Sequence, residues 1–250
     1  MDEKMRKLFL LLSLFLALPA CAEGNQSVQS FTKAKTLLKN VVYAGHNETF
    51  YCHGTFDKNN NITLPKGFTM PTHEKRAKKL EWEHVLPAEH FGRAFTQWRE
   101  GHPECIDSKG KSFKGRKCAE KTSEEFRFML CDMYNLYPAI GAVNAIRSNI
   151  AYDELENEKS SFGSCPFKVG KNQVEPPPYT RGAIARTYLY FDDAYSKYHM
   201  SDSMRKLMTA WDKMYPVDEW ECERAKRIEK LQGNVNKFVK SKCEEAGFSR

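Results

Sequence analysis

The chain has 250 residues and a formal net charge of +7, with 39 Lys and Arg against 32 Asp and Glu. This length suits one large domain or two small ones, and a hydrophobic content of 41% excludes a largely disordered chain. The only stretch apolar enough to consider for a membrane lies at the N-terminus, which excludes a polytopic membrane protein. The moderate positive charge suits a polyanionic partner but does not by itself select one.

Residues 1–22 have the pattern of a secretory signal peptide. A basic start and a short apolar run precede the small-x-small cleavage signal Ala20-Cys21-Ala22. An uncleaved anchor and a lipid attached at Cys21 are the alternatives. We expect cleavage after Ala22, which removes three basic and two acidic residues and leaves residues 23–250 with a charge of +6. The protein is then periplasmic or secreted, with no membrane partner.

Seven of the eight cysteines lie beyond this signal. An exported chain meets an oxidising environment, so we expect disulfides, and an odd number leaves at least one thiol over. There is no Cys-x-x-Cys pair and no Cys/His spacing of the zinc-finger type, so structural disulfides are the default interpretation.

The first half of the mature chain mixes helix, strand and loop signals. Apolar residues at helical spacing predict a helix over residues 28–45, and residues 50–52 read as a short strand. The alternation over residues 81–86 predicts a strand that Pro87 closes. Residues 99–121 are rich in Lys, Gly and Ser and predict a long basic loop.

The second half is predominantly helical in pattern. Thr122 and Glu125 form a capping-box signature that opens a helix to about Cys131. Further helices are expected over residues 139–147, 182–198, 201–214 and 218–231. We therefore expect one mixed α+β domain, over residues 23–250, with a helical C-terminal half.

The densest polar cluster is Glu81-Trp82-Glu83-His84. Neighbouring side chains of a strand point to opposite faces, so Glu83 and His84 serve one site only if the chain bends there, which Pro87 permits. The carboxylate of Glu83 suits a hard cation such as Mg²⁺, and a neutral His84 imidazole can take a proton from water. From spacing alone, a solvated strand end with a structural histidine is the favoured alternative.

A second cluster includes Asn144, Arg147 and Ser148. On a helix these residues share a face, where the Asn carbonyl suits Mg²⁺ or Ca²⁺ and the Arg suits phosphate. Alone, this cluster favours the alternative, a set of caps and turn hydrogen bonds.

Together the two clusters resemble the endonuclease I family of periplasmic and secreted bacterial nucleases, which belongs to the His-Me finger, or ββα-metal, nucleases. The matching segments occur in family order and span nearly the whole mature chain. They include residues 50–52, 81–88, 115–118, 141–149, 181–188 and 219–222.

The resemblance implies a role for each matching residue. His84 matches the general base and Arg116 the arginine that holds the scissile phosphate, so both count as catalytic. Glu83 and Asn144 match the metal ligands, for Mg²⁺ with Mn²⁺ or Ca²⁺ as possible substitutes. The implied fold is a central ββα unit with His84 on the first strand and Asn144 on the helix, and the implied products carry a 5′ phosphate.

The expected substrates are DNA and RNA, bound through the phosphate backbone by a monomer with little sequence preference. Arg116, Lys117 and Arg147 are the predicted substrate contacts. Lys109, Lys111 and Lys114 are further candidates, with a solvated loop as the alternative. A non-catalytic nucleic-acid-binding protein descended from such a nuclease, or a hydrolase of another phosphodiester, are the competing functions.

Against the family pattern, Cys131 is an extra cysteine. The expected pairing is then Cys52–Cys165, Cys105–Cys118 and Cys222–Cys243, with Cys131 as the free thiol, although sequence alone leaves other connectivities open.

Four polar positions of the family have become apolar or aromatic around the expected catalytic helix. They are Leu130, Tyr134, Ala142 and Ile146. Since the four primary positions remain, we expect an active enzyme whose metal affinity or pH optimum differs from that of its relatives, with reduced activity as the alternative.

Overall fold

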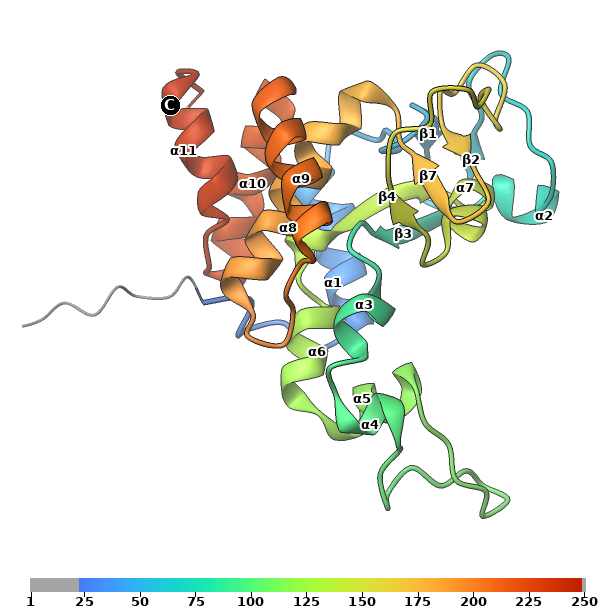
Figure 1. Cartoon of the computed structure of the whole chain (residues 1–250), viewed down its shortest axis with the longest axis vertical. Coiled ribbons are helices and arrows are strands. Elements are labelled where there is room, and N and C mark those ends of the chain that lie inside the picture. Colours follow the sequence, from blue (N-terminus) through green and yellow to red (C-terminus); the bar gives the residue numbers. More distant parts are fainter. Residues whose placement is uncertain (1–22, 249–250) are drawn as a thin grey trace, which may run out of the picture.

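A computed structural model describes residues 23–248, so the predicted signal peptide lies outside the described residues. The architecture is mixed α+β with small sheets and a helical C-terminal region, as predicted (Figure 1). The strands are β1 (Thr55–Phe56), β2 (Ile62–Thr63), β3 (Leu80–His84), β4 (Leu136–Ile140), β5 (Ala151–Tyr152), β6 (Lys168–Val169) and β7 (Gln173–Glu175).

Helices surround these strands on several sides. They are α1 (Phe31–Leu37) with its π-helical continuation η1 (Leu38–Val42), α2 (Glu74–Ala77), α3 (Ala88–Gly92), α4 (Thr96–Arg99), α5 (Arg116–Thr122), α6 (Glu124–Leu130), the 3-10 turn η2 (Met133–Asn135), α7 (Gly141–Arg147), α8 (Pro178–Ala194), α9 (Asp202–Met214), α10 (Glu219–Gln232) and α11 (Lys237–Glu245). No described helix is long and apolar enough to cross a bilayer.

The strands β3 and β4 form an antiparallel pair that carries the site. The register sets Glu83 opposite Tyr137 and His84 opposite Leu136. The chain passes directly from β4 into α7, whose first residue is Gly141. A glycine is needed there, because a Cβ would lie 2.5 Å from the carbonyl oxygen of Arg76. The helix predicted from residue 139 was therefore placed too early, since the two residues before Gly141 pair with β3 instead.

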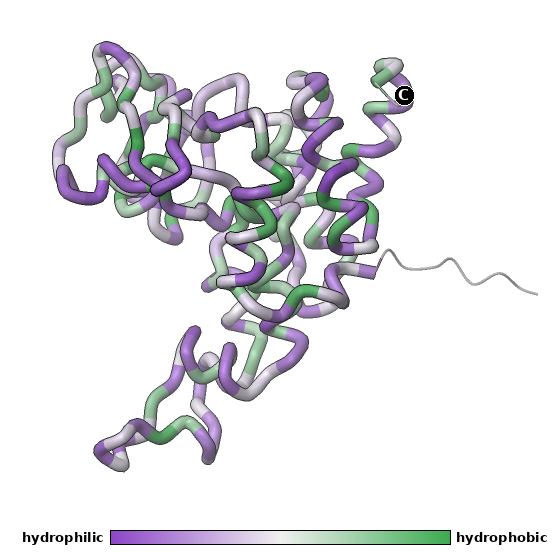
Figure 2. Tube along the Cα trace, turned by 180° about the vertical axis from the view of Figure 1, so that it is seen from behind, coloured by the Kyte–Doolittle hydropathy of each residue, from purple (hydrophilic) through white to green (hydrophobic). Residues whose placement is uncertain are grey.

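The C-terminal helices form a layer in which α8 packs against α9 and α10 against α11 (Figure 1). Their caps follow the sequence: the Ser201 side chain accepts from the Met204 amide and the Asp218 side chain from the Glu221 amide. Hydrophilic and hydrophobic stretches alternate along these helices, as expected for helices that cover a core with one face (Figure 2). The predicted helices over residues 201–214 and 218–231 are confirmed.

Two local predictions are wrong. Residues 50–52 form a turn rather than a strand, held by the Phe50 amide, which donates to the Pro138 carbonyl oxygen. Ser123 rather than Thr122 caps α6, because Thr122 still belongs to α5 and its hydroxyl donates to the Cys118 carbonyl oxygen. At Phe50 a longer-range contact overrides the local pattern, whereas at Thr122 a hydrogen bond within the preceding helix moves the cap by one residue.

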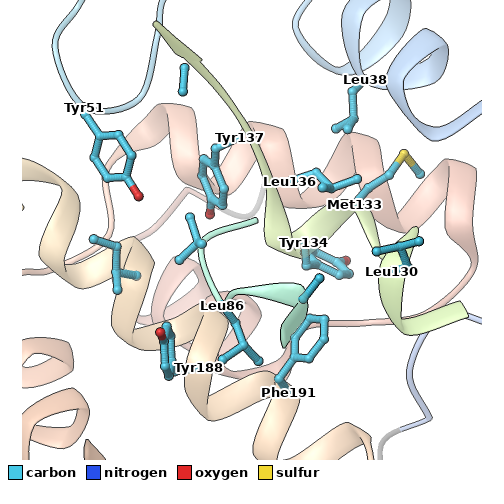
Figure 3. Packing of buried hydrophobic residues seen from close by; sticks show 14 of the residues in the cluster. Leu38, Tyr51, Leu86, Leu130, Met133, Tyr134, Leu136, Tyr137, Tyr188 and Phe191 are labelled. Atoms are coloured by element: carbon cyan, nitrogen blue, oxygen red, sulfur yellow. The ribbon is translucent and has the colours of Figure 1, made fainter. Parts of the chain in front are cut away.

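The core lies between the β3–β4 pair, η2 and α8. Figure 3 shows Leu86, Tyr134, Leu136, Tyr188 and Phe191 among its members, and each is at most 2% exposed. Burial of this many large side chains stabilises the surroundings of β3 and β4 and makes the site a rigid one.

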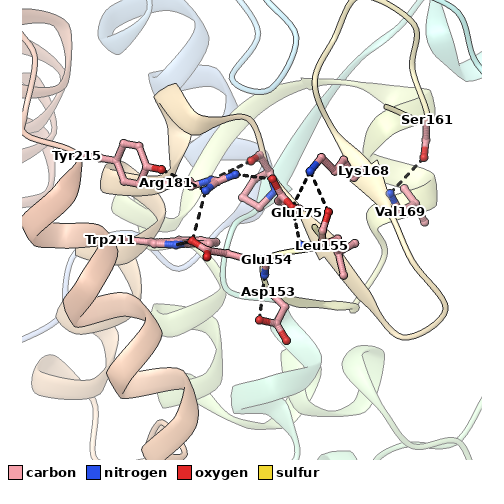
Figure 4. A network of polar contacts seen from close by, with 11 residues as sticks. Asp153, Glu154, Leu155, Ser161, Lys168, Val169, Glu175, Arg181, Trp211 and Tyr215 are labelled. Carbon is pink, nitrogen blue, oxygen red and sulfur yellow. Dashed lines mark hydrogen bonds and ion pairs between the residues drawn. The ribbon is translucent and has the colours of Figure 1, made fainter. Parts of the chain in front are cut away.

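A polar network joins the β5–β7–β6 sheet to the C-terminal helices (Figure 4). Arg181 of α8 pairs with Glu175 at 2.6 Å and donates to the Tyr215 hydroxyl. Glu154 accepts from both Arg181 and the indole of Trp211. This network orients the loops on the side of the molecule away from the basic loop.

The predicted disulfides are confirmed. Cys52–Cys165, Cys105–Cys118 and Cys222–Cys243 are bonded, and Cys131 is a buried free cysteine. Cys105 and Cys118 close the base of the loop that extends beyond α4 and α5 at the bottom of Figure 1. Burial raises the pKa of the Cys131 thiol to about 12, so this thiol is unreactive in the folded protein.

Alkylation tests this cysteine inventory. Native protein should resist iodoacetamide at neutral pH because Cys131 is buried and protonated. Denatured but unreduced protein should take up one label, located at Cys131 by peptide mass mapping. A label at another cysteine, or rapid labelling of the native protein, would contradict the pairing and the burial.

Candidate active site

His84 ends β3 as a buried side chain with a defined tautomer. Its Nε2 lies 2.9 Å from the carbonyl oxygen of Leu130, and because a carbonyl only accepts, Nε2 carries the proton and donates. Within residues 23–248 no protein group hydrogen-bonds to Nδ1, which is left as a proton acceptor. Burial, assisted by the Arg116 charge, lowers the pKa of His84 to about 3, so the imidazole is neutral at pH 7.

The contact with Leu130 explains how His84 is oriented at a position where the resemblance implies a polar residue in the family. Leu130 is fully buried, and it serves His84 through its backbone carbonyl rather than its side chain. Tyr134 and Ala142 are buried as well. At Leu130, the apolar replacement therefore leaves the orienting hydrogen bond of His84 in place.

Phe31 of α1 brings His84 and Arg116 together. The ring of Phe31 stacks on the His84 imidazole at 5.3 Å between centroids, and the Arg116 guanidinium lies 5.2 Å from the same ring. Sequence reasoning placed Phe31 on the apolar face of a helix and missed this role, because nothing local distinguishes it from a core residue.

The amide of Asn144 on α7 is held by a carboxylate. Its Nδ2 donates to Glu81 Oε2 at 2.7 Å, and Arg76 donates to both oxygens of the same carboxylate. This fixes the amide so that its other atom, the acceptor Oδ1, is the one available to a ligand. Glu81 was part of the sequence cluster, but its role as the partner of Asn144 depends on the β3–α7 contact.

Glu83 directly precedes His84 on β3, lines the α7 groove together with it, and is 2% exposed. Its Oε1 accepts from the Tyr51 hydroxyl and pairs with Arg147, each at 2.9 Å. Burial raises the pKa of Glu83 to about 7, while Arg147 and Tyr51 oppose this rise. The carboxylate is therefore poised between its two protonation states until a further positive charge is brought to it.

Arg147, predicted to contact the substrate, lies in the interior of the protein. The side chain is fully buried, and its guanidinium donates to the carbonyl oxygens of His84 and Val85 at 2.7 and 2.5 Å, besides pairing with Glu83. Such a side chain holds the end of β3 against α7. It has no exposed surface with which to meet a phosphate in this structure.

Two grooves meet at the site. The α1 groove, of about 540 Å³, runs from His84 and Arg116 along α1 towards Asn60. The α7 groove, of about 290 Å³, runs past Trp98 and the end of α7. Both are lined by Trp82, His84, Arg116 and Asn144. A polymer bound along both grooves would therefore pass His84 at their junction.

The basic loop residues are placed differently. Lys117 is exposed and lines neither groove, and the same holds for Lys109, Lys111 and Lys114. Of the predicted substrate contacts, only Arg116 faces the junction.

The donors at the junction fit a hard divalent cation. Glu83 and Asn144 both line the α7 groove and offer one carboxylate oxygen without a hydrogen bond and one amide oxygen. No group of three His, Cys, Asp or Glu capable of holding a metal occurs in the described part of the chain, which excludes a site of the structural zinc kind there. Two oxygen donors leave most positions to water and phosphate, as Mg²⁺ prefers.

Comparison with known proteins identifies the family of the chain. The profile of the Endonuclease I family matches residues 30–243. An extracellular deoxyribonuclease of Aeromonas hydrophila is 39% identical over 242 residues, which cover 94% of this chain and 98% of that protein. A periplasmic deoxyribonuclease of the same organism is 38% identical, covering 88% and 89% of the two chains. Endonuclease-1 of Buchnera aphidicola subsp. Acyrthosiphon pisum (strain APS) is 35% identical, covering 87% and 83%.

The chain is therefore an endonuclease by its kinship. It belongs to the endonuclease I family, as the resemblance of its motifs had indicated.

Replacing Arg147 with Met tests where this side chain acts. Removing one partner of a buried pair leaves Glu83 and two carbonyl oxygens uncompensated, so the free energy of unfolding in urea should fall by about 3 kcal/mol. The control Arg116→Met, at the mouth of the grooves, should change it by less than about 1 kcal/mol. An Arg147→Met protein of unchanged stability that binds DNA weakly would instead support a direct phosphate contact.

Proposed function

We propose that this protein is an exported, sequence-non-specific endonuclease that hydrolyses the phosphodiester bonds of DNA and RNA as a monomer with a divalent metal. The observation that carries the proposal is the neutral His84, with Nε2 tied to Leu130 and Nδ1 open, beside Arg116 and Asn144 at the junction of two grooves. The names of the relatives as deoxyribonucleases support DNA as the substrate.

The order β3, β4 and α7 supports the assignment to the His-Me finger nucleases. Two antiparallel strands are followed by one helix, with His84 on the first strand and Asn144 on the helix. In this proposal the strand pair supplies the base and one ligand, and the helix supplies the other ligand.

The proposed chemistry follows from the positions of the side chains. His84 Nδ1 accepts a proton from a water that attacks the phosphorus, while the hydrogen bond to Leu130 disperses the charge that develops on the ring. The guanidinium of Arg116 binds the scissile phosphate and neutralises its charge. Mg²⁺, held by Glu83 and Asn144, would stabilise negative charge on the phosphate and the leaving oxygen, and Mn²⁺ or Ca²⁺ could occupy the same ligands. The products carry a 5′ phosphate.

Export to the periplasm or the medium agrees with two independent observations. The relatives are named as extracellular or periplasmic proteins. Three disulfides link residues of the described part of the chain, and such bonds persist in oxidising compartments. The predicted localisation is thereby confirmed at this level.

Cleavage of supercoiled plasmid separates this function from a non-catalytic nucleic-acid-binding protein. Oxidised mature protein should nick the plasmid with Mg²⁺ and fail to do so with EDTA. His84→Ala should lower the rate by roughly 10²–10⁴-fold because the general base is lost. Retention on immobilised DNA in EDTA should be nearly unchanged in this variant. Absence of nicking with every divalent ion tried would leave the binding protein as the function.

A second test concerns the carboxylate that orients Asn144. Glu81→Ala should weaken metal binding by roughly 10–100-fold, because the amide of Asn144 is then free to rotate. The measurement is Mn²⁺ affinity by calorimetry, together with the Mg²⁺ concentration for half-maximal cleavage. The exposed Glu74→Ala is the matched control and should leave both unchanged. Equal affinities in the two variants would show that Glu81 does not position the ligand.

A further inference from the structure

One wall of the α1 groove is formed by α1 and η1, which carry none of the predicted substrate contacts. The residues that line it recur at spacings of three and four, and therefore share one helical face. They are Phe31, Thr32, Lys35, Thr36, Lys39 and Asn40. Apart from Phe31 this face is polar and basic, unlike the interior face of the same helix, where Ala34 and Leu38 are fully buried.

Two cations lie close to the Phe31 ring, which stacks on His84. The Lys35 ammonium lies 4.8 Å from the centre of the Phe31 ring, and the Arg116 guanidinium lies 5.2 Å from it. Neither Lys35 nor Arg116 forms an ion pair with any carboxylate of residues 23–248. The acid in this groove, Glu81, is already paired with Arg76. No ion pair of the described residues thus neutralises the positive charge at this end of the groove, and Glu120 acts on Arg116 only from a longer distance.

Lys39 extends the same charge one turn further along the wall. Its ammonium donates to the carbonyl oxygen of Lys58 at 2.5 Å, which leaves two of its three protons for a ligand. The neighbouring acid, Asp57, attracts the Lys39 charge but forms no ion pair with it in the described part of the chain, and its carboxylate accepts from the amides of Asn59 and Asn61. Four helical residues advance by about 6 Å, comparable to the step between neighbouring phosphates on one strand. Lys35 and Lys39, with their long side chains, are therefore spaced to reach neighbouring phosphates of one strand.

We propose that α1 and η1 form the track for the DNA strand that leaves the catalytic junction, with Lys35 contacting the phosphate next to the scissile one and Lys39 the phosphate beyond. The inference rests on the proposed nuclease function and adds the path of the substrate to it. The contacts are to the backbone, so they hold the strand without reading its bases.

This track differs from the one expected from the lysines of the basic loop. That loop extends from the body at the bottom of Figure 1, and its lysines line neither groove. Lys35 and Lys39, by contrast, lie along the groove that opens from His84. In this proposal Lys35 and Lys39 bind the strand during cleavage because they lie near His84. The loop lysines attract DNA at longer range.

The salt dependence of DNA binding measures these contacts directly. The protein is the oxidised mature chain carrying His84→Ala, and the probe is a short fluorescent DNA duplex titrated over a series of KCl concentrations. Replacing both Lys35 and Lys39 with Ala should make the slope of log K against log salt shallower by about 1.8, which corresponds to two phosphate contacts. Affinity at about 0.1 M salt should fall at least tenfold.

Matched variants separate the track from general charge loss. Lys33→Ala removes an exposed lysine of the same helix that lines neither groove, and should leave the slope unchanged. Replacement of Lys35 and Lys39 by Arg should restore the parent slope because the charges are kept. Melting temperatures should agree among all variants, since neither lysine is buried.

A neutral methylphosphonate placed one position from the scissile phosphate gives the register. It should weaken binding of the parent but have little further effect on Lys35→Ala. An unchanged salt slope in the double variant, or additive effects in this cycle, would overturn the track. Plasmid cleavage by the protein with His84 intact is measured separately. If this protein cleaves but the double variant keeps the parent salt slope, only this inference is refuted. If it does not cleave, the proposed function is refuted.

Discussion

Arg147 sits fully buried beneath the end of β3, where its guanidinium holds the carbonyl oxygens of His84 and Val85 and the carboxylate of Glu83. A charge removed from water must keep its partners, because losing one of them costs several kcal/mol. Helix α7 therefore cannot slide along β3 without breaking this cluster. Since Asn144 is on the same helix, the relation between the base on the strand and the ligand on the helix follows from one buried cation.

The charges of the site are divided between neutralised acids and unpaired cations. Glu81 is paired with Arg76 and Glu83 with Arg147, so the acids near the junction do not repel a phosphate as free carboxylates would. Arg116 has no ion pair within residues 23–248 and faces the grooves. The net charge of the chain did not by itself indicate a binding site. The fold places a cation without an ion pair at the grooves and neutralises the nearby acids, so the positive charge is concentrated where a phosphate would bind.

Three of the positions at which the resemblance implies a polar residue in the family belong to the packing around the site. Leu130 and Ala142 are fully buried, and the Tyr134 hydroxyl donates to the carbonyl oxygen of Asn234. Replacing polar groups by apolar ones in a closed interior removes the need to hydrogen-bond them. The orientation of His84 is preserved because it depends on a backbone carbonyl, which every residue type supplies.

The sequence by itself determined the features that depend on neighbouring residues or on a long motif. A strand over residues 81–86, observed as Leu80–His84, the helices that begin after Ser201 and Asp218, and the disulfide pairing were all predicted from it. The boundary between β4 and α7, the burial of Arg147 and the role of Phe31 were not. Each of these depends on which distant segment packs against the residue, and local patterns carry no such information. Only the tertiary structure decided that Arg147 is enclosed while α1 lies beside the base, because the environment of a charged or aromatic side chain is set by its neighbours in space.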